Sequence, residues 1–400
     1  MTTYKYMILG GGLAAGYAAQ AFAEAYTPPG KLCILSAENK LPYERPPLSK
    51  DFLAGEKTTE DILINEPEFY EKNNIDVHLN SRVWQVDLQR KQLYTADNKV
   101  FGFEKLLIAT GARPRRLDVP GADLKGIYYL RRVEDAKEIR QAADSAKEAV
   151  VIGGSFIGME VASVLQSADV KVTMVFPEEH VWDAFFTPEM SAFFENYYQE
   201  RGVTIMPQAQ VTGFEGENGR LTHVVLDNDS RLRTDMTVAG IGVQPNTQLF
   251  ADAGLQFIED GIAVNRFLET NLPDIYAAGD IACYNDVIFE QPRRFEHWDN
   301  AMAQGQHAIQ NMMGPRKPFV HVPYFFSDVF DLSYEFWGDA AGAQQVVHRG
   351  DVANGRFSVW WLGEDGRLLA AFVMNRPDEE RELAPQWIRE RVKLTAEPLV

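Results

Sequence analysis

One local pattern occurs twice in this chain: an apolar run, a glycine-rich turn and a segment of small residues. The first copy covers residues 6–22 (YMILGGGLAAGYAAQAF) and the second covers residues 149–162 (AVVIGGSFIGMEVA). In each copy the apolar run predicts a buried parallel strand, and the residues after the glycines predict a helix packed close to it. One such turn indicates little, because glycine-rich loops occur in many proteins that bind no nucleotide. Two copies predict an α/β chain with two dinucleotide-binding units.

The first turn has the residues that a dinucleotide pyrophosphate requires. Gly10 allows the backbone to reverse, Gly12 allows it to approach the pyrophosphate, and Ala15 allows helix and strand to touch. The next apolar run, residues 32–35, predicts the second strand. Glu38 follows the end of that strand, where a carboxylate can accept hydrogen bonds from a ribose. This spacing favours the ribose role over that of a solvated loop carboxylate.

The second turn departs from the strict fingerprint. Ser155 occupies the second glycine position, which leaves less room for a pyrophosphate. Phe176 stands where the following strand often carries an acidic residue, and the nearest carboxylates are Glu178 and Glu179. No arginine lies between residues 171 and 200, so a 2′-phosphate would meet negative charge. We therefore expect NADH at this site, with NADPH less favoured.

The composition disfavours several classes of function. At 400 residues the chain can form two or three domains. Its net charge of −18 disfavours nucleic acid and anionic lipid as partners. The longest apolar stretches are strand-sized and no signal-like segment opens the sequence, so we expect a cytoplasmic protein without a membrane span. Cys33 and Cys283 form no close redox pair, and the scattered histidines predict no metal site.

A rigid, charged segment follows Glu38 at residues 41–53 (LPYERPPLSKDFL). Its two adjacent prolines stiffen the backbone, and Ser49 is expected to cap a helix that starts near Lys50. Such a segment could hold Arg45 and Lys50 in fixed positions and so form part of a site. A proline-rich surface connection has the same composition, and residue chemistry alone leaves both alternatives open.

The rest of the chain predicts more strands and a different C-terminal part. Strands are expected at residues 76–86, 91–95, 103–114, 203–206, 221–226, 235–246 and 270–280. The last of these ends at a glycine turn with Asp280, whose carboxylate could bond to sugar-like hydroxyls. From about residue 315, aromatic-rich alternation predicts an antiparallel sheet and a third domain. The charged tail, residues 377–400, is expected to pack as a helix on that domain rather than on a membrane.

Four short motifs give the chain a family resemblance over essentially its whole length. They are residues 42–50 (PYERPPLSK), 109–111 (ATG), 278–280 (AGD) and 295–298 (FEHW). With the two glycine turns, they make the chain similar to flavoproteins of the pyridine nucleotide-disulfide oxidoreductase superfamily. The resemblance is to the branch that contains NADH-dependent ferredoxin and rubredoxin reductases, monodehydroascorbate reductases and apoptosis-inducing-factor-like proteins.

This resemblance implies a domain plan. The α/β fold would be glutathione-reductase-like, with two Rossmann-like dinucleotide-binding domains and a C-terminal α+β domain. The implied FAD-binding domain is discontinuous and comprises residues 1–112 and 242–314. Residues 113–241 would form the NAD-binding domain, and residues 315–400 the C-terminal interface domain.

The resemblance also assigns roles to single residues. FAD would meet Glu38 at its adenosine ribose, Arg45 and Arg131 at its diphosphate, Thr110 and Gly111 along its length, and Asp280 at its ribityl chain. Trp298, with Phe325 or Phe326, would cover one face of the flavin.

The candidate catalytic residues are Lys50 and Glu160. By the resemblance, Lys50 would lie beside the flavin and Glu160 near the nicotinamide of NADH, and the two could pair to fix both rings for hydride transfer. The full set of candidate cofactor-binding residues is Gly10, Gly12, Ala15, Glu38, Arg45, Lys50, Val83, Ala109, Thr110, Gly111, Arg131, Gly153, Ser155, Phe156, Ile157, Gly158, Glu160, Glu178, Gly242, Gly279, Asp280, Glu296, His297 and Trp298.

One departure from the superfamily narrows the reaction. Members that reduce disulfides carry a cysteine pair after the first unit, and members with thiol-based peroxide or oxygen chemistry carry one cysteine there. This chain has no cysteine between Tyr43 and Leu63, so electrons are expected to pass directly from flavin to an acceptor. The expected partner is a ferredoxin- or rubredoxin-type protein, and the expected oligomeric state is a monomer or homodimer.

Two alternatives remain open. The acceptor could be a small molecule, either the monodehydroascorbate radical or a quinone. Met302 argues against ascorbate, because it falls near the position where the monodehydroascorbate reductases place an arginine. The other alternative is an apoptosis-inducing-factor-like scaffold that responds to NADH by changing its conformation or its dimerisation.

Overall fold

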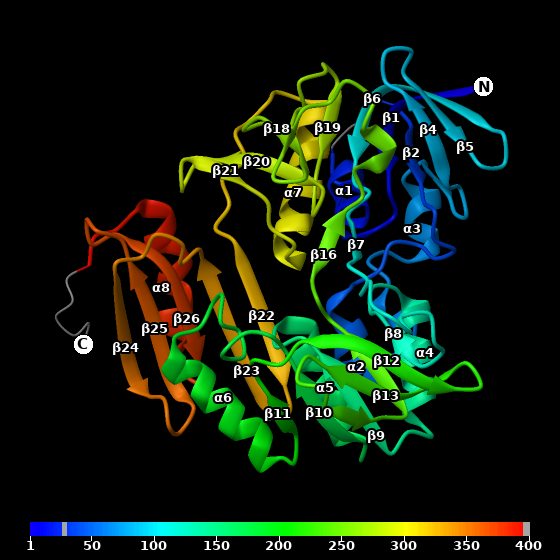
Figure 1. Cartoon of the computed structure of the whole chain (residues 1–400). Coiled ribbons are helices and arrows are strands. Elements are labelled where there is room, and N and C mark those ends of the chain that lie inside the picture. Colours follow the sequence, from blue (N-terminus) through cyan, green and yellow to red (C-terminus); the bar gives the residue numbers. More distant parts are fainter. Residues whose placement is uncertain (26–29, 395–400) are drawn as a thin grey trace. The chain divides into compact units, whose positions relative to one another are not determined.

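The computed structural model describes residues 1–25 and 30–394, which form two compact units (Figure 1). Each unit is assembled from three separate segments of the chain. The first comprises Met1–Arg45, Glu60–Arg113 and Gln244–Phe325, and the second comprises Pro46–Thr59, Pro114–Val243 and Phe326–Val400. The three-domain boundaries expected from the sequence stay a prediction.

A mainly parallel sheet forms the centre of the first unit. The strands of this unit are β1 (Thr2–Leu9), β2 (Leu32–Leu35), β3 (Ile75–His78), β4 (Val83–Asp87), β5 (Gln92–Thr95), β6 (Val100–Ile108), β17 (Phe257–Ile258), β18 (Gly261–Val264), β19 (Ile275–Ala277), β20 (Ala282–Asp286) and β21 (Gln291–Arg293). The main sheet has the order β3-β2-β1-β6-β5-β4, and β19 also pairs with β6. Strands β1, β2, β3, β6 and β19 are parallel, whereas β4 and β5 form an antiparallel edge. The second sheet has the order β17-β18-β20-β21.

Three of the strands predicted in this unit were too long. The strand expected at residues 103–114 ends at Ile108 in β6, and the strand expected at residues 270–280 is limited to Ile275–Ala277 in β19. Residues 76–86 do not form a single strand, because β3 ends at His78 and β4 begins at Val83. Asn80, between them, has a φ of +54°, which turns the chain out of the extended conformation.

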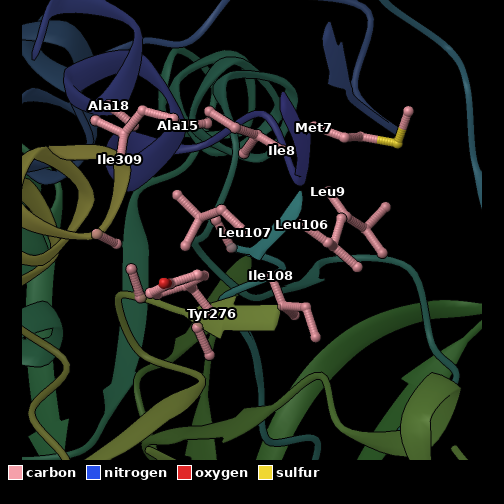
Figure 2. Close-up of a cluster of buried hydrophobic side chains, with 14 of the residues drawn as sticks. Met7, Ile8, Leu9, Ala15, Ala18, Leu106, Leu107, Ile108, Tyr276 and Ile309 are labelled. Carbon is pink, nitrogen blue, oxygen red and sulfur yellow. The ribbon is translucent and has the colours of Figure 1, made fainter. Parts of the chain in front are cut away.

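Figure 2 shows the apolar core between this sheet and its helices. Residues 7–9 of β1 and 106–108 of β6 are buried and lie side by side in parallel register. Ala15 and Ala18 belong to α1 (Leu13–Ala23), and Ile309 belongs to α7 (Trp298–Met313); all three are fully buried. The unit also contains α3 (Pro67–Lys72) and two 3₁₀ helices, Glu60–Ile62 and Gln248–Phe250. Small residues on α1 let this helix lie close to the sheet, as the sequence predicted.

Helices α1 and α7 cross at very short range. A Cβ at Gly305 of α7 would overlap the carbonyl oxygen of Ala14. Glycine is therefore required at this crossing, which fixes α7 against the beginning of α1.

The second unit contains the repeated nucleotide-binding pattern and the C-terminal sheet. Its strands are β8 (Ile127–Tyr128), β9 (Glu148–Ile152), β10 (Lys171–Val175), β11 (Thr204–Met206), β12 (Val211–Glu217), β13 (Arg220–Leu226), β14 (Arg231–Arg233), β15 (Met236–Ala239), β23 (Leu332–Gly338), β24 (Gln345–Asp351), β25 (Arg356–Leu362) and β26 (Leu368–Met374). Its helices are α2 (Asp51–Ala54), α4 (Val133–Ala143), α5 (Phe156–Ser167), α6 (Pro188–Glu200) and α8 (Asp378–Glu390), with a 3₁₀ helix at Pro46–Ser49. The chain passes between the units at five points. Three of them lie within strands, namely β7 (Ala112–Pro114), β16 (Val243–Pro245) and β22 (Tyr324–Val329).

Three sheets organise this second unit. A parallel sheet has the order β11-β10-β9-β15-β8, and a small antiparallel sheet has the order β12-β13-β14. The C-terminal sheet has the order β22-β23-β26-β25-β24, and the pairs among its last four strands are antiparallel. The predicted α/β class and the predicted antiparallel C-terminal sheet are therefore confirmed.

Helix α8 covers the C-terminal sheet. It contacts β23 and β26 and buries Ala384 and Ile388. The predicted packing of the tail as a helix on its own domain is confirmed up to Glu390, and residues 395–400 lie outside the described part. Within residues 1–25 and 30–394, none of the helices has the length and apolar character needed to cross a bilayer.

Candidate functional site

The first glycine turn joins β1 to α1. Gly10 has a φ of +123°, and a Cβ there would overlap the carbonyl oxygen of Ala109, so only glycine fits at this point. Gly12 has a φ of −93°, and the atom nearest to an added Cβ would be Arg45 Nη2 at 3.7 Å. A side chain at residue 12 would therefore fill only the open space at the N-terminus of α1. Backbone N–H groups and the helix dipole favour an anion there, so the opening fits the pyrophosphate of FAD.

Glu38, after β2, is fixed by two neighbours. Tyr43 Oη donates to one oxygen of its carboxylate at 2.6 Å, and Arg45 Nη2 donates to the other at 2.7 Å. Burial disfavours the charge of Arg45, yet Tyr43, Glu38 and Asp280 together raise the pKa of its guanidinium. Glu38 and Arg45, expected at different parts of FAD, therefore form one ion-paired group.

Asp280 follows β19 at a turn that α7 supports. Gly279 has a φ of +79°, and its N–H donates to Gln304 Oε1 of α7 at 2.9 Å. A Cβ at Gly279 would lie 3.6 Å from the Cβ of Ala14, so this turn meets the beginning of α1. After β6, the Thr110 hydroxyl is buried and has no hydrogen-bond partner among the described residues. A buried hydroxyl in this state is expected where a ligand supplies the missing partner, which again fits FAD.

The FEHW motif places aromatic rings at the start of α7. His297 lies between two phenyl rings, with its centroid 6.0 Å from that of Phe295 and 4.9 Å from that of Phe325. Burial lowers the pKa of His297 to about 4, and the carboxylates of Asp280 and Asp299 oppose this shift only in part. The imidazole is therefore neutral at physiological pH.

Trp298 is held by a carboxylate that the sequence reasoning did not select. Its Nε1 donates to Glu44, and the Tyr17 hydroxyl donates to the other oxygen of the same carboxylate. The rings of Tyr17 and Trp298 also meet edge to face, with centroids 6.2 Å apart. The neighbouring Glu296 pairs with Arg294 at 2.5 Å. Glu44 thus fixes the indole that is expected to cover the flavin.

Several candidates lie apart from these contacts. Val83, on β4, packs against the hydrophobic core of the first unit. Gly111 has a φ of +62° in the loop after β6, and Gly242 has a φ of +87° in the loop after β15. Arg131 belongs to the second unit, where its backbone N–H donates to Asp135 Oδ2 at 3.0 Å.

The second glycine turn, between β9 and α5, repeats the geometry of the first. Gly153 has a φ of +118°, and a Cβ there would overlap the carbonyl oxygen of Gly240. Gly158 is equally restricted, because its Cβ would overlap the carbonyl oxygen of Gly153. Helix α5 begins with Phe156 and Ile157 immediately after the turn. The two turns therefore share the same close approach of strand, loop and helix.

The departures of the second turn from the fingerprint have a local explanation. Ser155 precedes α5 with the same extended backbone that Gly12 has before α1, and its side chain makes no capping hydrogen bond. Phe176 is fully buried below the turn, where a Cβ on Gly154 would lie 2.8 Å from its ring. Phe176 therefore supports the turn from inside, and Glu178 and Glu179 are exposed carboxylates beyond β10.

Lys50 and Glu160 form a buried ion pair. Lys50 Nζ lies 2.5 Å from Glu160 Oε1, and the Ser327 hydroxyl donates to the same oxygen at 2.6 Å. The Ser49 hydroxyl donates to the other oxygen, Oε2. The prediction that Ser49 caps a helix is wrong, because its hydroxyl contacts Glu160 and Lys50 is the N-cap residue of α2. The pairing of Lys50 with Glu160 that the resemblance implied is present.

Three supporting residues of these sites were missed in the sequence. Glu44 lies within the PYERPPLSK motif, so the motif itself was a usable signal. Gln304 and Ser327 lie on a helix and a strand without any distinguishing spacing, and only the packing of distant segments identifies them.

The two cysteines are poorly suited to thiolate chemistry. Both are buried and free, and burial raises the pKa of Cys33 to about 12 and that of Cys283 to about 11. No group of histidine, cysteine and acidic side chains able to hold a metal ion occurs among residues 1–25 and 30–394.

Comparison with protein families gives two matches along the chain. Residues 4–305 match the family described as pyridine nucleotide-disulphide oxidoreductase, and residues 324–400 match the reductase C-terminal family. Among known proteins, the peroxisomal monodehydroascorbate reductase 4 of Arabidopsis thaliana is 38% identical over 398 residues. That match covers 95% of this chain and 81% of the Arabidopsis protein.

Two solved structures are similar over nearly the full length. The ferredoxin reductase for the CYP199A2 system from Rhodopseudomonas palustris has a TM-score of 0.94 and 32% identity, covering 99% of this chain and 96% of its own. Putidaredoxin reductase, in its covalent complex with putidaredoxin, has a TM-score of 0.92 and 32% identity, covering 98% of this chain and 95% of its own.

Proposed function

Because the chain belongs to the pyridine nucleotide-disulphide oxidoreductase family, we propose that it carries electrons from NADH to a small electron-transfer protein of the ferredoxin type. The chain is an FAD-dependent NAD(P)H oxidoreductase, and FAD and NADH are the cofactors of its relatives. The ferredoxin-type acceptor and the roles of single residues are the proposed parts. The expected cytoplasmic location also stays a prediction.

The residues of the first unit would hold FAD, which when bound supplies the redox chemistry of the reaction. The open turn at Gly12 would take the pyrophosphate, with Arg45 as its cationic neighbour. Glu38, already oriented by hydrogen bonds, would accept from the adenosine ribose. Asp280 would bond the ribityl hydroxyls, and the Thr110 hydroxyl would gain the partner that it lacks among the described residues.

The observation that carries the proposal is the buried Lys50–Glu160 pair in the second unit. A lysine charge in a site with little water stabilises negative charge far better than it would in solvent, which favours transfer of a hydride to the flavin. Glu160, immobilised by three donors, would orient the nicotinamide and so reduce the entropy lost in the transition state. The absence of a cysteine between Tyr43 and Leu63 supports an electron path without a dithiol.

The structural similarity to two reductases of the ferredoxin type supports a protein acceptor. The structural similarity includes the C-terminal sheet, so it covers nearly the whole chain. A rubredoxin would accept electrons by the same one-electron chemistry, so it is a second protein acceptor that fits the proposal.

A second candidate acceptor is the monodehydroascorbate radical. The 38% identity to a monodehydroascorbate reductase supports it. Met302, on α7, lies near the position where those enzymes are expected to carry an arginine. Its side chain has no charge that could attract an anionic radical. We therefore place the protein acceptor first and the small radical or a quinone second.

Anaerobic stopped-flow mixing tests this function. The FAD-loaded protein is mixed with NADH or NADPH, and then with ferredoxin, rubredoxin, the ascorbate radical or a quinone. Fast bleaching by NADH and rapid reoxidation by ferredoxin would support the proposal. Rapid reoxidation by the radical or the quinone, but not by ferredoxin, would show that the acceptor is a small molecule. Slow bleaching with a persistent long-wavelength band would contradict a reductase and favour an NADH-responsive scaffold.

A further inference from the structure

We infer that Ser327, on strand β22, is a positioning residue for Glu160, so that the C-terminal sheet controls how fast NADH reduces the bound flavin. This inference rests on the proposed role of the Lys50–Glu160 pair. It extends that role from the nucleotide-binding part of the second unit to the reductase C-terminal region.

Glu160 is a buried carboxylate whose two oxygens are both occupied. Oε1 accepts from Lys50 Nζ at 2.5 Å and from Ser327 Oγ at 2.6 Å, and Oε2 accepts from Ser49. Glu160 is 4% exposed and Ser327 is fully buried, so water cannot readily replace the Ser327 hydroxyl as a donor. Loss of this hydrogen bond therefore costs free energy. Lys50 and Ser49 come from one short segment, whereas Ser327 approaches from a different element.

Strand β22 contacts both members of the ion pair through consecutive residues. The ring centroid of Phe326 lies 5.5 Å from Lys50 Nζ, and Ser327 donates to Glu160. This strand therefore restrains the lysine and the carboxylate together. A strand backbone is a rigid support, and it holds a hydroxyl more accurately than a loop does.

The tip of the β22–β23 hairpin also braces the backbone next to Glu160. Phe330, at this tip, packs edge to face against Tyr198 of α6, with ring centroids 5.0 Å apart. The buried Tyr198 hydroxyl donates to the carbonyl oxygen of Met159 at 2.9 Å. Because Met159 precedes Glu160 in α5, the hairpin influences both the backbone and the side chain of the pair.

Loss of the Ser327 hydroxyl should therefore misplace the carboxylate while leaving the fold intact. Among the residues that the structure describes, Lys50 would be left as the donor to Oε1, and the Glu160 side chain would gain freedom to rotate. We expect the limiting rate of flavin reduction to fall by about tenfold or more, the size of effect caused by losing a hydrogen bond to a charged group.

The test compares S327A and S358A in the FAD-loaded protein. Ser358 is a matched control, because it is also fully buried on the C-terminal sheet but bonds Trp360 Nε1 at 3.0 Å instead of Glu160. Anaerobic stopped-flow gives the limiting reduction rate and the Kd for NADH, and each change is then repeated in an E160A background. S327A should slow reduction in the native background, have no further effect with E160A, and differ from S358A.

Two outcomes would overturn the inference. One is a reduction rate of S327A within twofold of the native rate, and the other is an equal slowing by S327A with and without Glu160, which would indicate a general packing effect. Should S327A lose FAD, S327C retains the volume with a much weaker donor and serves in the same comparison. A native protein that NADH fails to reduce would instead contradict the proposed function itself.

Discussion

Lys50 has a side chain only 11% exposed, and its charge is balanced by Glu160. Lys50→Ala should slow reduction of the bound flavin by NADH about 100-fold, the usual size for losing one preorganised electrostatic group. FAD should stay bound, because its proposed cradle is formed by other residues. Stopped-flow reduction and the flavin content of the purified variant measure both effects. Lys57→Ala is the control, since Lys57 lies in the same segment but pairs with Asp51 at an exposed position. An unchanged reduction rate would remove Lys50 from the mechanism.

The exposed carboxylate of Glu178 should decide the choice of nucleotide. Glu178→Arg replaces a charge that repels a 2′-phosphate by one that attracts it, so preference should shift toward NADPH by about tenfold or more. The ratio of kcat/KM for the two nucleotides measures this shift. Glu200→Arg, also exposed and in the same unit, makes an equal change in net charge at the C-terminal end of α6. No shift in E178R, or the same shift in both variants, would mean that another residue meets the ribose.

His297 should make stability depend on pH. Its pKa is lowered by burial from an ordinary 6.5 to about 4. Between these values the unfolded chain binds a proton that the folded chain excludes, so stability is retained above pH 6.5 and is lost as pH falls. From pH 7 to pH 5 the free energy of unfolding should drop by about 2 kcal/mol from this group. Denaturant titrations at both pH values measure the drop. His297→Gln should reduce it and His223→Gln should not; equal drops in all three proteins would exclude His297 as the cause.

The crossing of helices α1 and α7 supports the residues that are proposed to bind FAD. Gly305→Ala would add a Cβ that overlaps the Ala14 carbonyl, forcing the helices apart at a cost of about 1–3 kcal/mol. Because α7 also holds the Gly279 turn, FAD should be released more easily. Denaturant unfolding and the fluorescence of released FAD report the two effects. Gly314→Ala is the control, since its Cβ would lie 3.6 Å from the nearest atom, Gln310 O. Equal stability of the two variants would show that the crossing tolerates a methyl group.

Local sequence patterns predicted the elements that obey one simple rule. Both glycine turns, their strands and their helices were correct, because a buried parallel strand and a small-residue helix have strong signals. Nine strands were missed, namely β8, β12, β14, β17, β18, β20, β21, β23 and β24. Most of them are very short or are partly exposed antiparallel partners, and their pairing depends on neighbours that local periodicity does not reveal.

The site shows the same division between local and distant information. The short motifs contained Arg45, Lys50 and Asp280, and the spacing after the first glycine turn identified Glu38; each of the four lies close to a turn or strand end. The role of Ser49 was misjudged because a serine before a short helix usually caps it, whereas here a buried carboxylate from residue 160 competes for its hydroxyl. Ser327 gave no signal at all, since its function depends on contact with a residue far away in the sequence.

For the whole molecule, net charge should govern the encounter with a protein acceptor. At −18 the chain repels an acidic ferredoxin. Reoxidation of the reduced protein by such a ferredoxin should therefore speed up several-fold as salt rises from about 10 to about 200 mM, because screening weakens the repulsion. Stopped-flow rate constants measure this trend, and an uncharged quinone is the control that should show none. A rate that falls with salt would mean that local arginine clusters, such as residues 113–116, dominate the field that the acceptor meets.

The construction of each unit from three separate segments has a consequence for biosynthesis. The first unit lacks β19 until the ribosome has passed Ala277 and α7 until it has passed Met313, and the second lacks its C-terminal sheet until synthesis is nearly finished. When half of the chain has been synthesised, neither unit can complete its hydrophobic core. Strands that become buried in the finished protein are therefore exposed while translation continues. Contacts between distant segments also form slowly. The same fold that brings Ser327 to Glu160 therefore makes the nascent chain depend on protection from aggregation until its last strands have been synthesised.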